Sequence, residues 1–398
     1  MTGTGVEPHP PAPRGARAGP PHQRATWVEV DLAAITANVT ALKAQAAAPR
    51  LMAVVKADGY GHGMVPAARA ALAGGADWLA VALVEEGRTL REAGIDAPVL
   101  LLTEPPPAAA GTLLDADLTA SVYTPAFTEA LDAAAGQRGL VADVHVKLDT
   151  GMRRVGVPEG RWEEALRRVR DASWLRLTGL WSHFAVADEP DHPYIARQSA
   201  AFRRGLDLAA TLGIRPELVH LCNSAGTLHL PDDHHDMVRP GLSIYGLEPA
   251  PGLAGSTPLR PALAWYSRLA LVKAVPAGGS VSYGLRWTAD RDTLVGTVPA
   301  GYADGVTRAL TNRGEVLVAG RRMPMVGTVT MDQFLVDLGH DVGAGGTPSE
   351  GDEVCLIGAQ GDERVTAEQW AALLGTINYE IVCTIGGRVP RVHLGGDR

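Results

Sequence analysis

The sequence predicts an α/β protein in which an N-terminal (β/α)8 barrel of the TIM type is followed by a mostly-β C-terminal domain. Two observations predict this architecture. From residue 51 to about residue 250, short apolar segments alternate with segments of helical periodicity; from about residue 258, short apolar segments are separated by glycine, proline and aspartate. Strands that alternate with helices are typical of a parallel sheet, and eight such units are typical of a closed barrel. The alternative is an open doubly wound sheet, which would need a GxGxxG turn after its first strand, and this sequence has none there.

Eight apolar segments of the first region are bounded by turn residues, as expected of buried parallel strands. These predicted strands are 52–56, 78–83, 99–103, 119–123, 143–149, 177–184, 218–223 and 237–245. Helical spacing lies between most of them, and the predicted helices include 64–72, 85–93, 125–135, 159–170 and 194–212. In the second region the predicted strands are 263–274, 293–299, 315–318, 323–329, 333–338 and 353–357, with one helix over 367–374.

The chain is therefore expected to have three parts. Residues 1–24 are rich in proline, glycine and alanine and are expected to form a disordered tail, without the apolar stretch of a secretory signal. Residues 25–257 are expected to form the barrel, with 25–31 as a candidate to pair with the C-terminal domain. That β-rich domain is expected to cover residues 258–398.

Composition argues against several classes of function. The net charge of −8 and the pI of about 5.8 argue against a nucleic-acid-binding protein and against attachment to an anionic membrane. No segment approaches the roughly 18 apolar residues that span a bilayer. The cysteines, Cys222, Cys355 and Cys383, are far apart and lack a metal-binding spacing, which favours the reducing cytoplasm. His234 and His235 are expected in a surface loop without a metal, because adjacent residues rarely bind one ion.

Lys56 is the most informative single residue. It is expected at the end of the first barrel strand, where burial would lower the pKa of its amine and make it a nucleophile or a base. The chain has 36 lysines and arginines, and only Lys43, Lys56, Lys147 and Lys273 are lysines. A lysine at this position therefore suggests that amine chemistry is needed. The structural alternative is a lysine that extends from a strand end to the surface.

Polar residues also follow the other predicted strands, and a barrel places its active site at the carboxyl ends of its strands. These residues are Tyr60, His62, Lys147, Asp149, Arg153, Arg154, Ser182, His183, Asn223, Ser224 and Arg239. His183 also suits a core position, and Asn223 with Ser224 also suits a helix cap. Arg153 and Arg154 also suit a solvated pair. Because all of these residues should meet at one mouth of the barrel, the set favours a site over unrelated structural roles.

The residue types at this mouth indicate a cofactor. Ser224 and the backbone N–H groups of Gly241 and Leu242 are suited to hold a phosphate, and barrels commonly bind phosphate after their last two strands. A phosphate site beside a desolvated lysine predicts pyridoxal 5'-phosphate (PLP), bound as a Schiff base. Where many such enzymes pair a carboxylate with the pyridine nitrogen, this sequence has Arg239.

The chain resembles the alanine racemase family in nine segments that occur in order across residues 27–393. They are AVVKADGYGHG (53–63), KLDTGM (147–152), SHF (182–184), NSA (223–225), RPG (239–241), VSYG (281–284), GYADG (301–305), GTVTMDQ (327–333) and NYE (378–380). The resemblance implies the barrel-plus-β fold, PLP, a small amino-acid substrate and a head-to-tail homodimer. In such a dimer the β-domain of one subunit brings the Tyr283 position to the Lys56 site of the other.

The resemblance also implies the roles of the bases and of their neighbours. Lys56 would carry the cofactor and act as the base for the D-enantiomer, and Tyr283 would act as the base for the L-enantiomer. His183 would hydrogen-bond Tyr283, and Arg239 would lie against the pyridine nitrogen.

The remaining roles concern the two ligands. Arg154 would bind the phenolic oxygen of the cofactor and the substrate carboxylate, braced by Lys147, which is carbamylated in many relatives. The residues implied around the phosphate and the cofactor are Tyr60, Asn223, Ser224, Gly241, Leu242 and Tyr379. Those implied around the substrate are Tyr302, Met331 and Asp332.

The chain departs from the common family pattern at three places. Asp58-Gly59 stands where Asn-Ala is frequent, and Arg153 stands where glycine is frequent, which leaves open which of Arg153 and Arg154 has the role given to Arg154. Thr330 stands where cysteine is common and could alter the floor of the pocket, and with it the range of substrates.

The sequence thus predicts a cytoplasmic, PLP-dependent alanine racemase, an isomerase that supplies D-alanine for peptidoglycan by a two-base mechanism. Racemisation requires removal of a proton from one face of the substrate and delivery of a proton to the other face, and one base on each face does this. A cation network through His183 and Arg239 would favour the phenolate form of Tyr283. The alternatives are a broader amino-acid racemase that also accepts serine, a PLP decarboxylase of the same architecture and a non-catalytic PLP-binding protein. A decarboxylase would want an acid in place of Arg239.

Overall fold

The structure is a computed structural model that describes residues 24–340 and 346–395. The predicted disordered tail therefore lies outside the described residues, apart from its last residue, Arg24. The chain divides into two compact units. One contains Asp31–Ala262 and the residues from His393 onward; the other contains the residues up to Val30 and Leu263–Val392.

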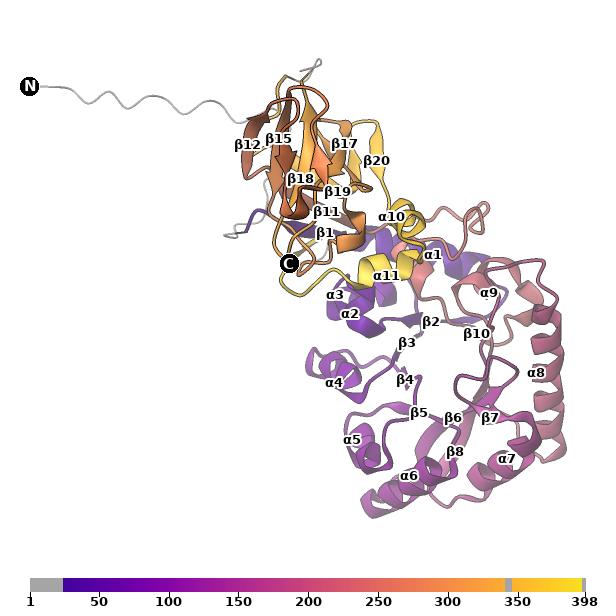
Figure 1. Ribbon diagram of the computed structural model, residues 1–398. Helices are drawn as coiled ribbons and strands as arrows, with labels where there is room; N and C mark the ends of the chain where they lie inside the picture. Colours follow the sequence, from indigo (N-terminus) through magenta and orange to yellow (C-terminus); the bar gives the residue numbers. More distant parts are fainter. Residues whose placement is uncertain (1–23, 341–345, 396–398) are drawn as a thin grey trace, which may run out of the picture. The chain divides into compact units, whose positions relative to one another are not determined.

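The larger unit is the predicted (β/α)8 barrel, and the fold class is confirmed (Figure 1). Eight parallel strands follow the order β10-β2-β3-β4-β5-β6-β8-β9. The backbone N–H groups of Asp236 and Arg239 donate to the carbonyls of Val219 (3.0 Å) and Cys222 (2.9 Å), which joins the two end strands. The strands are β2 (Arg50–Val54), β3 (Trp78–Val81), β4 (Val99–Leu101), β5 (Thr119–Val122), β6 (Ala142–Asp149), β8 (Leu175–Trp181), β9 (Leu218–His220) and β10 (Met237–Val238), and β7 (Val157–Pro158) pairs with β6.

Helices surround these strands on the outside (Figure 1). Local sequence signals set their ends: Asp31 caps the first helix by accepting from the N–H of Ala34 (3.0 Å), and Thr124 caps the helix that starts at Pro125. The helices are α1 (Leu32–Gln45), α2 (Lys56–Tyr60), α3 (Met64–Ala73), α4 (Val84–Glu92), α5 (Ala110–Asp115), α6 (Pro125–Arg138), α7 (Trp162–Asp171), α8 (Tyr194–Thr211) and α9 (Ser224–His229). Short 3₁₀ turns are η1 (Pro107–Ala109), η2 (Glu159–Arg161), η3 (Pro231–Asp233) and η4 (Leu242–Tyr245).

The smaller unit is a mostly-β domain built on a ten-stranded sheet. Its main path is β12-β15-β18-β17-β16-β19-β11-β1-β21, with β20 beside β19 and a separate pair of β13 and β14. The strand β1, from the start of the chain, pairs antiparallel with β11 in a register that matches Trp27 with Tyr266. The elements are β1 (Trp27–Asp31), β11 (Leu263–Arg268), β12 (Leu271–Val275), β13 (Ser280–Val281), η5 (Tyr283–Leu285), β14 (Trp287–Thr288), β15 (Thr293–Val298), η6 (Arg308–Leu310), β16 (Glu315–Val318), β17 (Arg321–Val326), β18 (Phe334–Gly339), β19 (Glu353–Gln360), β20 (Glu363–Val365), α10 (Ala367–Leu374), α11 (Asn378–Cys383) and β21 (Arg391–Leu394).

Several predicted strands end earlier than the sequence pattern suggests. The prediction that Lys56 ends a strand is wrong, because β2 stops at Val54 and Lys56 begins the turn α2. The predicted strand 237–245 is also wrong beyond Val238, since 242–245 forms the 3₁₀ turn η4. The predicted strand 263–274 is two strands, because the chain turns after Arg268. In each case apolar residues continue past the last hydrogen bond between the strands, so hydrophobicity alone overestimates the length of the strand.

The prediction that His234 lies in a surface loop is wrong. Its ring is 2% exposed, accepts from the backbone N–H of Ala47 at Nδ1 (2.9 Å) and lies 3.2 Å from the carbonyl oxygen of Gly226 at Nε2. It therefore fastens the end of α1 to α9. Among the described residues, no group of histidine, cysteine, aspartate or glutamate is arranged to hold a metal ion.

No helix in the described part of the chain is both long and apolar enough to cross a bilayer.

Asn38, fully buried on α1, closes the barrel unit on itself. Its Nδ2 donates to the carbonyls of Ile244 (3.1 Å) and Arg260 (2.9 Å), and its Oδ1 accepts from the N–H of Arg260 (2.8 Å). We expect Asn38→Leu to lower the free energy of unfolding by about 3 kcal/mol, because buried backbone groups lose their partners. Chemical denaturation followed by circular dichroism measures this change. Ala37→Leu, on the exposed face of the same helix, is the control and should change stability by less than about 0.5 kcal/mol; equal effects of the two variants would contradict the prediction.

Candidate active site

The barrel brings the predicted cationic residues together at the carboxyl ends of its strands. Lys56 follows β2, Arg154 follows β6 and Arg239 follows β10, while Lys147 lies on β6 itself. The positive charges of all four lower the pKa of His183, which follows β8, beyond the larger effect of its burial. The mouth of the barrel is therefore strongly electropositive and suits a ligand with several negative charges.

The chain leaves β2 through a left-handed turn directly after Lys56. Ala57, Asp58 and Gly59 have φ of 52°, 52° and 60°, and Tyr60 follows with φ of 53°. Consecutive left-handed residues are rare because each non-glycine residue costs roughly 1–2 kcal/mol. Other contacts must therefore hold this turn, and with it the position of Lys56.

Glu86, at the start of α4, supplies one of these contacts. Its Oε1 accepts from the N–H of Ala57 (2.6 Å), and its Oε2 accepts from the N–H groups of Ala82 (2.8 Å) and Leu83 (3.1 Å). Asp58 closes the other end of the turn, since its Oδ1 accepts from the N–H of Met64 (2.8 Å). Asp58 is exposed, and its carboxylate stabilises the turn.

A second part of the mouth is formed by three residues that lie close together, Tyr60, Ser224 and Gly241. The Ser224 hydroxyl accepts from the N–H groups of Gly241 (2.9 Å) and Ser243 (3.3 Å). A Cβ on Gly241 would lie 2.5 Å from the Tyr60 hydroxyl, so only glycine allows this approach. Asn223 caps α9 by accepting from the N–H of Gly226 (3.0 Å), so the capping role suggested by the sequence is confirmed for Asn223.

Arg239 is buried without a carboxylate partner among the described ion pairs. Its guanidinium donates to the carbonyls of Ser182 (2.8 Å) and Leu221 (3.1 Å) and contacts the Nδ1 atoms of His183 (3.2 Å) and His220 (3.0 Å). Burial lowers the pKa of Arg239 to about 9, so it remains charged at neutral pH. The residue is 3% exposed, and four acceptors in the barrel fix its plane.

Lys147 is also buried, with its Nζ 4.1 Å from the centre of the Trp181 ring. Burial lowers the pKa of Lys147 to about 7, and the charges of Arg239, Arg154 and Lys56 add to this effect. A substantial fraction of the amine is therefore neutral at neutral pH, which is the form that reacts with electrophiles.

Of the two adjacent arginines, Arg154 is the one whose charge affects the cluster. It lowers the pKa of both Lys147 and His183, and Arg153 is not among the causes of either shift. Arg153 has a positive φ of 58°, and its N–H donates to Asp149 (3.0 Å). This electrostatic difference favours the choice of Arg154 that the sequence left open.

The other predicted site residues belong to the smaller unit. Tyr283 is 76% exposed on a strained turn, in which Ser282 and Leu285 have φ of 63° and 47°. Thr328 donates to the carbonyl of Tyr283 (2.7 Å), and Ser282 donates to the carbonyl of Thr328 (2.7 Å). These contacts hold the turn while its aromatic side chain projects into solvent.

Tyr302 and Met331 lie on two loops that backbone hydrogen bonds join side by side. The N–H of Tyr302 donates to Thr330 (3.0 Å), and the N–H of Ala303 donates to Met331 (3.0 Å). A Cβ on Gly301 would lie 2.2 Å from the carbonyl oxygen of Met331, so glycine is required there. Asp332 is paired with Arg388 (2.7 Å). Tyr379 lies on α11.

Sequence reasoning missed three residues that support the cluster: His145, His220 and Trp181. The Trp181 ring stacks on His220 at 5.5 Å, and its other contacts are Lys147 and the guanidinium of Arg239 at 4.7 Å. Alternation along β6 places His145 and Lys147 on the same face, and this signal could have identified His145. His220 could be found only from the register of β8 with β9, which pairs it with Trp181.

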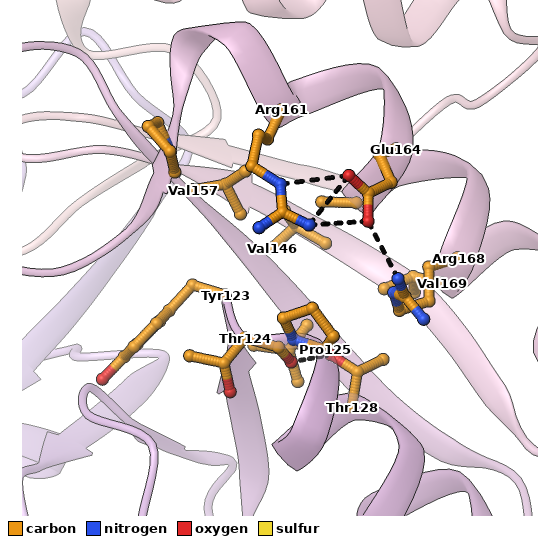
Figure 2. Close-up of a pocket in the computed structure, with 13 residues that line it drawn as sticks. Tyr123, Thr124, Pro125, Thr128, Val146, Val157, Arg161, Glu164, Arg168 and Val169 are labelled. Carbon is orange, nitrogen blue, oxygen red and sulfur yellow. Dashed lines mark hydrogen bonds and ion pairs between the residues drawn. The ribbon is translucent and has the colours of Figure 1, made fainter.

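A separate small cavity lies away from these residues, on the outer layer between α6 and α7 (Figure 2). Figure 2 shows the Arg161–Glu164–Arg168 network at its rim and Tyr123, Thr124 and Val146 among its lining residues. Its volume of about 40 Å³ is close to that of a single water, so it is too small for a cofactor.

Comparison with known proteins gives a consistent result. Residues 30–249 match the family model "Alanine racemase, N-terminal domain", and residues 262–393 match "Alanine racemase, C-terminal domain". Curated alanine racemases from Symbiobacterium thermophilum and Frankia casuarinae are 47% and 46% identical; the matches cover 94% and 95% of this chain and 98% and 99% of the relatives. Solved structures of alanine racemase from Streptomyces lavendulae and Streptomyces coelicolor each align with a TM-score of 0.89 at 44% identity, over 94% of this chain and 98% of theirs.

We expect Glu86→Ala to loosen the left-handed turn after Lys56. Three backbone N–H groups lose their acceptor, which should lower the free energy of unfolding by about 1–3 kcal/mol. Amide hydrogen exchange over residues 57–61 should become faster than in the native chain. Glu92→Ala, which removes only an exposed ion pair with Arg88 at the other end of the same helix, is the matched control and should leave both measurements nearly unchanged. Unchanged exchange in Glu86→Ala would show that the turn holds itself.

Proposed function

The chain belongs to the alanine racemase family, and we propose that it binds PLP at the mouth of its barrel and uses Lys56 and Tyr283 as opposing bases. The enzyme is an alanine racemase, an isomerase that interconverts L-alanine and D-alanine. The relatives named above are alanine racemases, so a broader amino-acid racemase, a decarboxylase and a non-catalytic PLP-binding protein are not favoured.

The residues at the mouth of the barrel fit PLP. The observation that carries this proposal is a buried guanidinium, Arg239, that lacks a carboxylate partner among the described residues and shares its surroundings with Lys56, Lys147 and Arg154. Such a set of cations suits a ligand with an anionic phosphate, a phenolic oxygen and an amino-acid carboxylate. When bound, the cofactor supplies an electron sink that makes the α-proton of the amino acid acidic.

Each part of the mouth then has a role. Tyr60, Ser224, Gly241 and Leu242, with Tyr379, hold the phosphate, and Asn223 positions the loop that carries Ser224. Arg154 binds the phenolic oxygen and the substrate carboxylate. Tyr302, Met331 and Asp332 complete the substrate side, with Met331 acting through its backbone.

Two bases account for racemisation. Lys56 holds or accepts the proton on one face of the substrate, and Tyr283 does so on the other. His183 donates a hydrogen bond toward the Tyr283 oxygen, and Arg239 faces the pyridine nitrogen. Because Arg239 retains its charge and has only N–H donors, it cannot accept a proton, and it leaves that nitrogen largely unprotonated. By disfavouring a proton on that nitrogen, Arg239 would weaken the electron sink that the cofactor supplies, which would favour reprotonation over transamination.

A second copy of the chain completes the site in this proposal. Tyr283 and Leu285 are 76% and 65% exposed, and Tyr302 and Met331 are 44% and 51% exposed, all in the smaller unit. Such apolar exposure is typical of a surface that another chain covers. A head-to-tail homodimer would place Tyr283 of one subunit at Lys56 of the other. We further propose that the enzyme is cytoplasmic, that its D-alanine is used in the cell wall, and that its functional domains divide near residue 258.

Subunit sharing can be tested by complementation. Lys56→Ala should lose the covalent cofactor link, seen as loss of the absorbance that borohydride reduction removes. Tyr283→Ala should keep that link and lose abstraction of the α-proton from L-alanine, measured by exchange into solvent. Mixing the two inactive variants should restore part of the activity, because each mixed dimer has one site with both bases. Failure of mixed dimers to recover activity would contradict a shared site.

Lys147 is expected to carry a carbamate. A neutral amine adds to CO₂ and releases one proton, and burial holds the pKa of Lys147 at about 7, so the reaction should be favoured above that pH and reversed below it. Carbon-13 NMR in labelled bicarbonate should show one carbamate signal that fades as the pH falls through about 7. Lys147→Arg should lack the signal. Lys43, whose ammonium is paired with Asp77 at 2.9 Å, is the internal control and should carry none; a signal that persists in Lys147→Arg would refute the assignment.

A further inference from the structure

Three histidines and Arg239 form one continuous hydrogen-bonded chain inside the barrel. His145 Nδ1 lies 2.9 Å from His220 Nε2, and His220 Nδ1 lies 3.0 Å from the guanidinium of Arg239. The same guanidinium reaches Nδ1 of His183 at 3.2 Å. His145 and His220 are both 0% exposed. His145 lies at one end of this chain of contacts, and neither the sequence nor the proposed function gives it a role.

The chemistry of arginine gives this chain a direction. A guanidinium has only N–H donors, so His220 and His183 must each accept at Nδ1. A neutral imidazole that accepts at Nδ1 carries its proton on Nε2. His220 must then donate from Nε2 to Nδ1 of His145, which leaves the proton of His145 on its own Nε2. Burial and the nearby charge of Arg239 lower the pKa of all three histidines, that of His145 to about 3, so all three are neutral.

Two features of the backbone make room for His145. The register of β6 with β8 shifts between Val144 and His145, a bulge that places His145 opposite Gly179. A Cβ at position 179 would lie 2.3 Å from the His145 ring, so only glycine leaves space for it. The ring also contacts Trp78 at 5.5 Å and His220 at 5.0 Å. The position of this side chain is therefore closely determined.

Burial of the polar His145 ring has a free-energy cost that an apolar side chain would avoid. Its Nε2 is buried and has no hydrogen-bond partner among the described residues. Phenylalanine has a similar planar shape and would leave no such group, but it could not accept the proton of His220. What His145 contributes is thus the acceptor at Nδ1.

We propose that His145 is a positioning residue for racemisation: by accepting from Nε2 of His220, it fixes the tautomer and orientation of His220 and thereby holds the plane of Arg239. This inference rests on the proposed function for its consequence, since Arg239 is placed there against the pyridine nitrogen. It predicts that reaction fidelity depends on a residue that touches neither substrate nor cofactor.

The first test uses the apoenzyme and does not depend on cofactor. Nitrogen-15 NMR of histidine-labelled protein should show His220 and His183 as neutral Nε2–H tautomers, with His220 identified by loss of its signals in His220→Gln. His145→Gln, whose amide oxygen can accept, should retain the His220 tautomer. His145→Phe should give mixed or broadened His220 signals. If His220 of the wild-type protein is protonated on Nδ1, that measurement alone overturns the proposal, and no variant of His145 is needed.

The second test uses the holoenzyme and measures fidelity. We expect His145→Phe to raise the fraction of turnovers that end in transamination by about tenfold, because a buried donor loses its acceptor and Arg239 loses its fixed plane. His145→Gln should stay within about twofold of the wild type. Gly179→Ala displaces the His145 ring without changing a polar group and should act like His145→Phe, which gives a second variant if one fails to fold.

The matched control is Ser121→Ala. Ser121 is buried at the register position beside His145 on the neighbouring strand, and its hydroxyl makes no hydrogen bond among the described residues. Removing this hydroxyl should change neither the His220 tautomer nor the fraction of turnovers that end in transamination. The role of His145 would be refuted if both His145→Phe and Gly179→Ala left the His220 tautomer and the fraction of turnovers that end in transamination unchanged. An apoenzyme that gives the expected tautomers but does not bind PLP would instead refute the proposed function and leave the hydrogen-bonded chain in place.

Discussion

A buried guanidinium that has no carboxylate partner among the described residues is the constraint on which the rest of the barrel site depends. Transferring such a cation out of water is costly unless its donors find acceptors, and here two carbonyls and two imidazoles lie within hydrogen-bond distance of Nη1 and Nη2. The carbonyls of Ser182 and Leu221 are available because β8 and β9 end just before them. Burial lowers the pKa of both imidazoles and of Lys147, and the charge of Arg239 lowers each of them further. The tautomers of the two histidines and the protonation of Lys147 thus depend in part on one residue.

The two groups of proposed site residues are held by different physical means. On the barrel side, buried groups are held by packing and by hydrogen bonds to the ends of parallel strands. In the smaller unit, Tyr283 is presented on a turn whose backbone is strained and whose side chains are exposed. Strain of this kind persists only where surrounding contacts determine the conformation, and the bonds of Ser282 and Thr328 do so here. The backbone of Tyr283 is therefore held in place while its ring stays accessible.

The existence and order of the barrel strands could be predicted from sequence because each is a short apolar segment between turn residues. Their ends could not, because the last ladder bond of β2, from the N–H of Val55 to Ala80, depends on a neighbouring strand. The helix α1 was not predicted; its many alanines give little contrast between its faces. Motifs located Lys56, Arg239 and Tyr283, since these are adjacent to glycine-rich turns. His145 and His220 are 75 residues apart and meet only through strand register, which a single sequence does not reveal. Glu86 was missed for the same reason, because its contact with Ala57 joins segments 29 residues apart.

The pairing of β1 with β11 has a consequence for how the protein is made. Trp27 leaves the ribosome early, whereas its partner Tyr266 is added only after the whole barrel has been synthesised. At about 5–20 residues per second, the first strand waits roughly ten to fifty seconds for its neighbour. During that time an apolar strand with free backbone groups is exposed, which is the usual starting point for mispairing between nascent chains. All the strands of the barrel are synthesised in the meantime, so the C-terminal sheet, which needs both ends of the chain, is the last part of this molecule that can be completed.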